Sequence, residues 1–240
     1  MKVIVLYGIA LILALGVSAC RVNGNINGKV VVDNTVLNYE NSARITELFA
    51  APEFELDLGF ADVNLRGTAD NKLDLIVRYK EYSPADATIL IRDGKLSYET
   101  KSGKPAAIMS VSGTIPGNIS LEIETGSGDV QISQMRGKNR IEIDSGSGDL
   151  EISESDLALL DVDTGSGDVD IVSCLITDLV ADTGSGDVSL SRSQITNADL
   201  DTGSGDIILN DSEITYKKFE TGSGKVQDGR GAGNSGKEAF

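Results

Sequence analysis

The 240-residue chain contains no histidine and no tryptophan, and it has only two cysteines and four prolines. Without histidine, the chain lacks the commonest general base and the commonest metal-ligating side chain. Without tryptophan, it lacks the aromatic ring that stacks most strongly on sugars. The chain is nevertheless long enough to bury a core without disulfides or metals. These absences count against an enzyme.

Positive charge is also scarce. The chain has 21 basic residues against 37 acidic ones, a net charge of −16 and a pI of about 4.3. Such a balance argues against binding to nucleic acid and against electrostatic attraction to anionic lipid. Any affinity for a membrane must therefore come from another source.

The first twenty residues supply one. Lys2 is followed by an apolar run over residues 3–17 and by Val17-Ser18-Ala19-Cys20, which resembles the lipobox of bacterial lipoproteins. A membrane-spanning helix is the alternative, but the run is shorter than the roughly 20 apolar residues that a span needs. We therefore expect a lipoprotein signal peptide over residues 1–19, removed to leave an acylated Cys20 as membrane anchor.

Arg21 stands where an inner-membrane retention signal would resemble aspartate, so we expect the outer membrane, with either face possible. Residues 20–50 are polar and Asn-rich at their start, which favours a tether with a first strand at residues 29–32. Cys174 is the only other cysteine, so it has no partner for an intramolecular disulfide in the mature chain. We expect it to be a small packing residue, because serines occupy the equivalent positions of neighbouring repeats.

Residues 51–120 alternate apolar and polar side chains in short stretches, which predicts an all-β segment. Asp93-Gly94, between two such stretches, is the strongest short hairpin signal in the chain. After Pro116-Gly117 the pattern becomes strictly periodic. The motif Thr-Gly-Ser-Gly-Asp or a close variant then starts at Thr125, Ser145, Thr164, Thr183, Thr202 and Thr221, first with a step of 20 residues and then with steps of 19.

A repeat of this length is typical of stacked supersecondary units. Apolar residues lie four and two positions before each motif start and five and seven positions after it, and a further column lies at twelve (Leu157, Ile176, Ile195, Ile214). This spacing of two indicates strands, and it contradicts a long helix, which would also have two glycines in every repeat. We therefore predict an all-β fold, a single-stranded parallel β-helix (β-solenoid) of about six coils over residues 121–228, right-handed, with an irregular all-β N-terminal portion.

Within each coil we expect two strands joined at Gly-Ser-Gly and a third short side. The glycines should provide backbone angles that a side chain forbids. In the last repeat Lys217, Lys225 and Asp228 take apolar or corner positions, which predicts a polar cap. Residues 229–240 are Gly-rich and should form a flexible tail.

Two acidic columns flank the corner. Stacked carboxylates about 4.8 Å apart repel by about 0.9 kcal/mol per pair in water, which a bound cation would relieve. This suggests a calcium site, with Asp149, Asp168, Asp187 and Asp206 as candidate ligands. The favoured alternative is that these aspartates accept backbone N–H groups at the corner and need no cofactor.

A polysaccharide-degrading β-helix enzyme is the less favoured alternative. Its catalysis would need two carboxyl groups in different environments, whereas the acids here are copies of one another. No residue stands out as catalytic or cofactor-binding.

The segment Pro116-Gly117-Asn118-Ile119-Ser120 and the motif copies that follow it resemble the bacterial envelope β-solenoid domains grouped as putative adhesins, the head-GIN-type domains and their relatives. The Asp93-Gly94 hairpin is similar to the front half of those domains, so the resemblance covers residues 50–228. It implies a cell-surface or periplasmic β-solenoid, often lipid-anchored, and no site residues. We therefore expect a non-catalytic envelope protein acting as adhesin or surface scaffold, with a protein or glycan partner; a calcium-dependent or glycan-binding module is the alternative.

Overall fold

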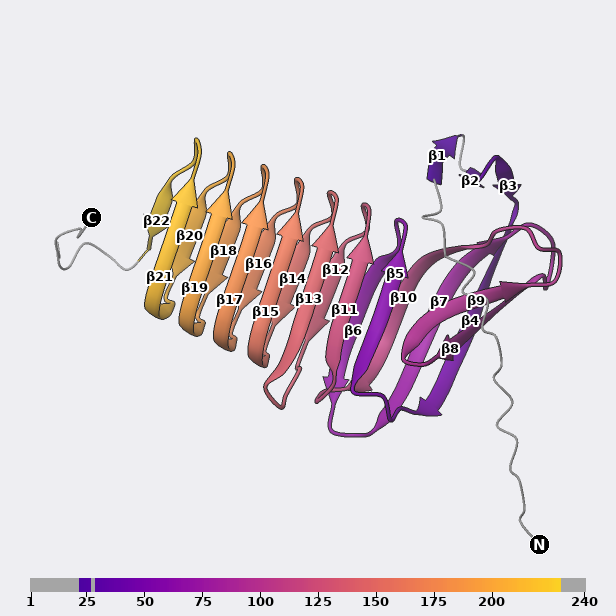
Figure 1. Ribbon diagram of the computed structural model, residues 1–240, viewed down its shortest axis with the longest axis horizontal. Coiled ribbons are helices and arrows are strands. Elements are labelled where there is room, and N and C mark those ends of the chain that lie inside the picture. The colour runs from indigo at the N-terminus through magenta and orange to yellow at the C-terminus, as the bar shows by residue number, and fades with distance from the viewer. Residues whose placement is uncertain (1–21, 27–28, 230–240) are drawn as a thin grey trace, which may run out of the picture.

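The computed structural model describes residues 22–26 and 29–229, and all regular elements in this part of the chain are strands (Figure 1). The strands form three sheets: sheet 1 has 10 strands, sheet 2 has 9 strands and the small sheet 3 has 3 strands. The described residues include no helix long and apolar enough to cross a membrane. The predicted signal peptide, Cys20 and nearly all of the predicted tail lie outside the described residues.

Six coils form the solenoid, because each repeat supplies one strand to sheet 2 and the next strand to sheet 1 (Figure 1). The strands of sheet 2 are β11 (Ser120–Thr125), β13 (Asn139–Ser145), β15 (Asp156–Thr164), β17 (Leu175–Thr183), β19 (Gln194–Thr202) and β21 (Glu213–Thr221). Those of sheet 1 are β12 (Val130–Ser133), β14 (Leu150–Ser153), β16 (Val169–Val172), β18 (Val188–Ser191), β20 (Ile207–Asn210) and β22 (Val226–Asp228).

Neighbouring coils pair in parallel with equivalent residues opposite each other. Val169 pairs with Val188, and Val188 pairs with Ile207. The predicted parallel β-solenoid is therefore confirmed. The predicted third short side is wrong, because the column at twelve belongs to the long strands of sheet 2: Leu157 and Ile176 are opposite each other in β15 and β17.

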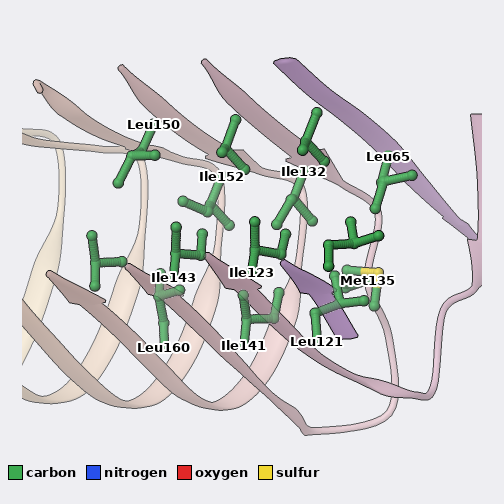
Figure 2. Packing of buried hydrophobic residues seen from close by; sticks show 14 of the residues in the cluster. Leu65, Leu121, Ile123, Ile132, Met135, Ile141, Ile143, Leu150, Ile152 and Leu160 are labelled. Carbon is green, nitrogen blue, oxygen red and sulfur yellow. The ribbon is translucent and has the colours of Figure 1, made fainter. Parts of the chain in front are cut away.

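The interior is a continuous stack of aliphatic side chains from the two sheets. Every second residue of β12, β14 and β16 in sheet 1 is buried. Figure 2 shows Leu65, Ile132 and Ile152 from sheet 1 pointing towards Leu121, Ile141 and Leu160 from sheet 2. Burial of this apolar surface, at about 25 cal/mol per Å², is the main force holding the coils together.

A further coil precedes the six that the motif predicts. It consists of β5 (Glu53–Leu58) and β6 (Asp62–Thr68), which pair in parallel with β11 and β12. Sheet 1 then continues through β10 (Ala107–Pro116), β7 (Lys72–Glu81) and β4 (Tyr39–Leu48), and sheet 2 through β9 (Lys95–Thr100) and β8 (Ala87–Arg92). The β8–β9 hairpin turns at Asp93-Gly94, as predicted.

The segment predicted as a tether is mostly structured. Residues 29–32 form strand β2 (Lys29–Val32), which pairs antiparallel with β1 (Val22–Ile26) and β3 (Thr35–Leu37) in sheet 3. The ten residues of β4 pair with β7 along their whole length. Hydrogen bonding to an adjacent strand therefore takes the place of the tether from residue 29 onwards.

At the C-terminal end, the last coil is largely exposed. Lys217 lies opposite Ala198, in the position of a buried apolar residue, and its Nζ lies 5.6 Å from the centre of the Phe219 ring. Lys225 takes the corner position of the aspartates.

Candidate functional site

The Gly-Ser-Gly corner carries the most regular polar structure in the protein. The hydroxyl at the motif start is buried in the first five coils. In the first four coils it accepts a hydrogen bond from the N–H of the second glycine of the same motif, whereas the hydroxyls of Thr202 and Thr221 donate to the carbonyl oxygen of that glycine. The N···O distance is 3.2 Å from Gly167 to Thr164 and 2.9 Å from Gly186 to Thr183. The same residue therefore closes the turn in coil after coil.

The second glycine is required because adjacent coils approach closely there. A Cβ on Gly186 would lie 1.9 Å from the carbonyl oxygen of Gly167 in the preceding coil. The expected special backbone angles do not include a left-handed one, because the described glycines with positive φ are Gly94, Gly103, Gly113 and Gly137. Glycine is required here because adjacent coils lie too close together for a side chain.

The aspartate after the second glycine joins each coil to the next. Oδ1 of Asp149 accepts the N–H of Asp168 at 3.0 Å, and Oδ1 of Asp168 accepts that of Asp187 at 2.8 Å. The series ends where Oδ1 of Asp206 accepts the N–H of Lys225 at 2.7 Å. We call this column the aspartate ladder: Asp62, Asp129, Asp149, Asp168, Asp187 and Asp206.

The structure thus brings the four candidate calcium ligands, Asp149, Asp168, Asp187 and Asp206, into one column. Each uses one carboxylate oxygen to hold a backbone N–H of the following coil. Within residues 22–26 and 29–229, no group of three or more aspartate, glutamate, cysteine or histidine side chains is arranged to hold a metal ion. The observed role of the ladder is the backbone-binding one.

The second acidic column lies before the corner and faces solvent on sheet 2: Glu124, Asp144, Asp163, Asp182, Asp201 and Glu220. Carboxylates crowd most at the N-terminal end of this face. Burial raises the pKa of Glu122 there, and the charges of Glu55, Glu53, Glu142 and Glu124 raise it further. This face therefore favours cationic or neutral partners over anionic ones.

A second corner, at the opposite end of the coils, was not anticipated. One residue here in each of the first five coils has a left-handed backbone, as at Ser173 (φ 57°) and Arg192 (φ 52°). After Glu154, Arg192 and Asp211 the next residue is a buried serine whose Oγ accepts an N–H from the preceding coil, as Ser193 Oγ does from Cys174 N at 3.1 Å. The left-handed positions are Gln134, Glu154, Ser173, Arg192 and Asp211.

Cys174 belongs to this column and replaces a serine. Its side chain is 1% exposed, and its Sγ lies 3.4 Å from the carbonyl oxygen of Val172. Burial raises the pKa of the Cys174 thiol, although backbone hydrogen bonds of Ser155 and Val172 partly oppose the shift. The thiol is therefore kept protonated and out of reach of solvent.

The outer face of sheet 2 carries a groove near its C-terminal end. It has a volume of about 310 Å³ and runs between two rows of side chains, Asp178, Asn197 and Tyr216 on one side and Val180, Asp199 and Lys218 on the other. The Tyr216 side chain is 68% exposed. Next to it, Asn197 Nδ2 donates to Asp178 Oδ1 at 2.6 Å, and Lys218 Nζ donates to Asp199 at 3.1 Å.

Sequence reasoning missed two polar residues. Asp62 begins the aspartate ladder, since its Oδ1 accepts the N–H of Asp129 at 3.2 Å. The segment Gly59-Phe60-Ala61-Asp62 is a diverged copy of Gly-Ser-Gly-Asp and could have revealed it. Asn139 Oδ1 is buried and has no hydrogen-bond partner among the described residues, while Nδ2 donates to the carbonyl of Ile119. No sequence signal marks that position.

Residues 117–228 match the family model described as Toastrack DUF4097. None of the curated proteins matches the chain. Solved structures similar to it include a putative adhesin from Bacteroides fragilis, with 13% identity over 78% of this chain and 97% of that one and a TM-score of 0.42. Another putative adhesin, from Parabacteroides distasonis, has 11% identity over 79% and 97% of the two chains and a TM-score of 0.44. A putative lipid binding protein from Parabacteroides distasonis has 15% identity over 78% and 96% and a TM-score of 0.38.

Proposed function

We propose that this chain, whose residues 117–228 belong to the Toastrack DUF4097 family, is a non-catalytic envelope protein that acts as an adhesin or surface scaffold. The observation that carries the proposal is the aspartate ladder. Its carboxylates repeat in one environment and hold the N–H of the next coil, as Asp168 does for Asp187 at 2.8 Å. A catalytic pair needs two carboxyl groups whose environments differ. The repeated polar groups therefore serve to stack a rigid, elongated surface.

The partner can be found by pull-down from the native envelope with the purified protein as bait. An adhesin or scaffold should retain a defined protein or glycan, and a protein with disrupted coils should not. A screen of acidic and neutral polysaccharides tests the enzymatic alternative. Turnover that one carboxylate substitution abolishes would overturn the non-catalytic assignment.

We place the protein at the outer membrane, held by a lipid on Cys20. The sequence around Cys20 and the net charge of −16 support this, since a strongly acidic chain needs a covalent anchor to stay on an anionic membrane. Cys20→Ser should abolish incorporation of labelled palmitate and release the protein from the membrane fraction. Retention of Cys20→Ser in that fraction, without label, would contradict the anchor.

We propose further that the ladder works without a cofactor. A calcium-dependent module would gain stability from the ion by mass action, whereas a ladder satisfied by backbone N–H groups would not. The melting temperature in millimolar calcium should equal that in chelator. If millimolar calcium raises the melting temperature, and Asp168→Asn abolishes that increase, the calcium alternative would be supported instead.

The groove beside Tyr216 favours glycan binding as a second candidate function. An exposed aromatic ring next to an amide–carboxylate pair offers both a stacking surface and hydrogen-bonding groups. The excess of carboxylates on this face selects against anionic sugars. Saturation-transfer NMR with a neutral oligosaccharide such as cellotriose should show contacts that Tyr216→Ala removes and that Tyr39→Ala, at the other end of the molecule, leaves intact.

A further inference from the structure

Among the described residues, four strands lie at the free edges of the two large sheets: β4 and β22 in sheet 1, and β8 and β21 in sheet 2. A free edge presents unpaired backbone groups to which another chain can add a strand. β4 is the longest of the four, with ten residues. Figure 1 shows it at the end of the molecule opposite to the last coil.

The C-terminal edge is protected by charge. Lys217 occupies the inward-facing position of β21 and is exposed, because no further coil covers it within the described part of the chain. A second copy placed on this end would bury its ammonium group in the aliphatic stack. An inward-facing charge is a known way to prevent edge-to-edge pairing.

β4 has no inward-facing charge over residues 39–45, but the N–H of Ser42 is held by Asn41 Oδ1 at 2.8 Å and has to exchange that partner for a second strand. Ala43 and Ile45 face the core and are partly buried against it. Tyr39 and Asn41 lie on the same face, since side chains alternate along a strand. The Tyr39 side chain is 45% exposed. Glu47 is the first acidic residue on this face and lies beyond the segment.

The opposite face of β4 is complementary to itself. In an antiparallel pair with its two-fold axis at Ser42, Glu40 lies opposite Arg44 of the second copy, and the symmetry produces this ion pair twice. Each member already has a partner within its own sheet: Arg78 binds Glu40 at 2.5 Å, and Arg44 binds Asp74 at 2.7 Å. The row across the junction would thus alternate in charge.

The same register also suits the core-facing side, because it places Tyr39 opposite Ile45 and Asn41 opposite Ala43. Moving the axis to Arg44 would place two arginines opposite each other, and moving it to Ala43 would leave Glu40 opposite Thr46. Opposite charges and aromatic–aliphatic pairs across strands are stabilising, whereas like charges are not. One register is therefore favoured.

We propose that β4 pairs antiparallel with β4 of a second copy of this chain, about a two-fold axis at Ser42, so that sheet 1 continues from one copy into the other. The interface is isologous, as in most homodimers. It is small, so the association is concentration-dependent.

Cysteine cross-linking of the full chain tests this register. The two Ser42 Cα atoms would lie about 4.5–5.5 Å apart, within the range of a disulfide. The two Thr46 residues would be about 27 Å apart at 3.4 Å per residue. Under mild oxidation Ser42→Cys should give a covalent dimer. Thr46→Cys should give no more covalent dimer than the wild-type chain does. The wild-type chain contains Cys20 and Cys174, so its dimer yield sets the background.

A mixing experiment supplies the second measurement. Neither Glu40→Cys nor Arg44→Cys should cross-link alone, but an equimolar mixture of the two chains should, because these positions face each other only between copies. Folding of each variant is checked by its circular dichroism spectrum. Equal cross-linking of Ser42→Cys and Thr46→Cys, or no product above background from Ser42→Cys and from the mixture, would overturn the proposal.

Discussion

Replacement of one corner glycine by alanine tests how the coils are held together. In Gly186→Ala the new Cβ would lie 1.9 Å from the carbonyl oxygen and 2.5 Å from the carbonyl carbon of Gly167. Both atoms belong to the backbone, so no side chain can rotate away. The two coils must separate by about 1 Å at this corner, since a Cβ is essentially never found within 3.0 Å of another atom.

That separation weakens the hydrogen bonds around the corner. The N–H groups of Gly184, Asp187 and Val169 donate between these two coils across distances of 3.0, 2.8 and 2.8 Å. At about 1 kcal/mol each, their loss costs about 3 kcal/mol. Alanine restricts the unfolded chain and recovers about 0.4–1 kcal/mol. We expect Gly186→Ala to lower the free energy of unfolding by about 2–3 kcal/mol.

Urea unfolding followed by circular dichroism measures this loss, provided that the slope with denaturant stays constant. Gly103→Ala is the matched control, because Gly103 has a left-handed φ of 70° but no atom within 4 Å of the added Cβ. Its cost should be about 1 kcal/mol, which is the left-handed backbone penalty of about 1–2 kcal/mol less the same recovery from the unfolded chain. A smaller loss for Gly186→Ala than for Gly103→Ala would refute the close-approach argument.

Four further predictions concern the corners and the core. Arg192→Gly should raise the free energy of unfolding by about 0.5–1 kcal/mol, because it relieves the left-handed backbone (φ 52°) of the second corner; a loss of stability would contradict this. Asp168→Ala should lower the free energy of unfolding by about 1 kcal/mol, because it removes the acceptor of the Asp187 N–H. Asp168→Asn keeps an acceptor and removes a repelling charge, so its loss should be smaller at low salt. Equal losses for the two variants in urea unfolding would argue against the backbone role of the carboxylate. Cys174 should resist alkylation in the folded protein, because the thiol is buried. Its pKa is raised in the folded state, so near the usual thiol pKa only the unfolded chain loses the thiol proton. The free energy of unfolding should therefore fall as the pH rises above that value. Cys174→Ser should remove this slope, and an unchanged slope would exclude the thiol as its cause. Asn139→Leu should raise the melting temperature, corresponding to about 1 kcal/mol, because it removes a buried oxygen without a partner among the described residues; a lower melting temperature would show that its bond to Ile119 matters more.

The solenoid could be predicted because its information is repeated. A buried column requires the same class of residue every 19 positions, so Val169, Val188 and Ile207 reveal their register without any contact being known. The backbone-binding role of the corner aspartates was also foreseen. Both depend on a geometry that every coil reproduces.

Other features leave no repeated signal. The left-handed positions of the second corner are filled by glutamine, glutamate, serine, arginine and aspartate, so backbone strain there is not encoded by residue type. The antiparallel order β4–β7–β10 depends on contacts between segments far apart in the chain, and β4 pairs with β7 through polar as well as apolar residues. The close approach between coils at the glycines was not predicted, because close approach and unusual backbone angles both select glycine.

The aspartate ladder has a direction, because each carboxylate accepts the N–H of the coil that follows it. Asp206 holds Lys225, and lysine has no acceptor with which to receive another coil. A copy of the repeat appended after residue 228 would therefore begin at a corner with nothing to bind its amide. Longer versions of this protein should instead arise by duplication of an internal unit between Asp129 and Asp206, so that the reach of the molecule changes in whole coils while its final coil is inherited unchanged.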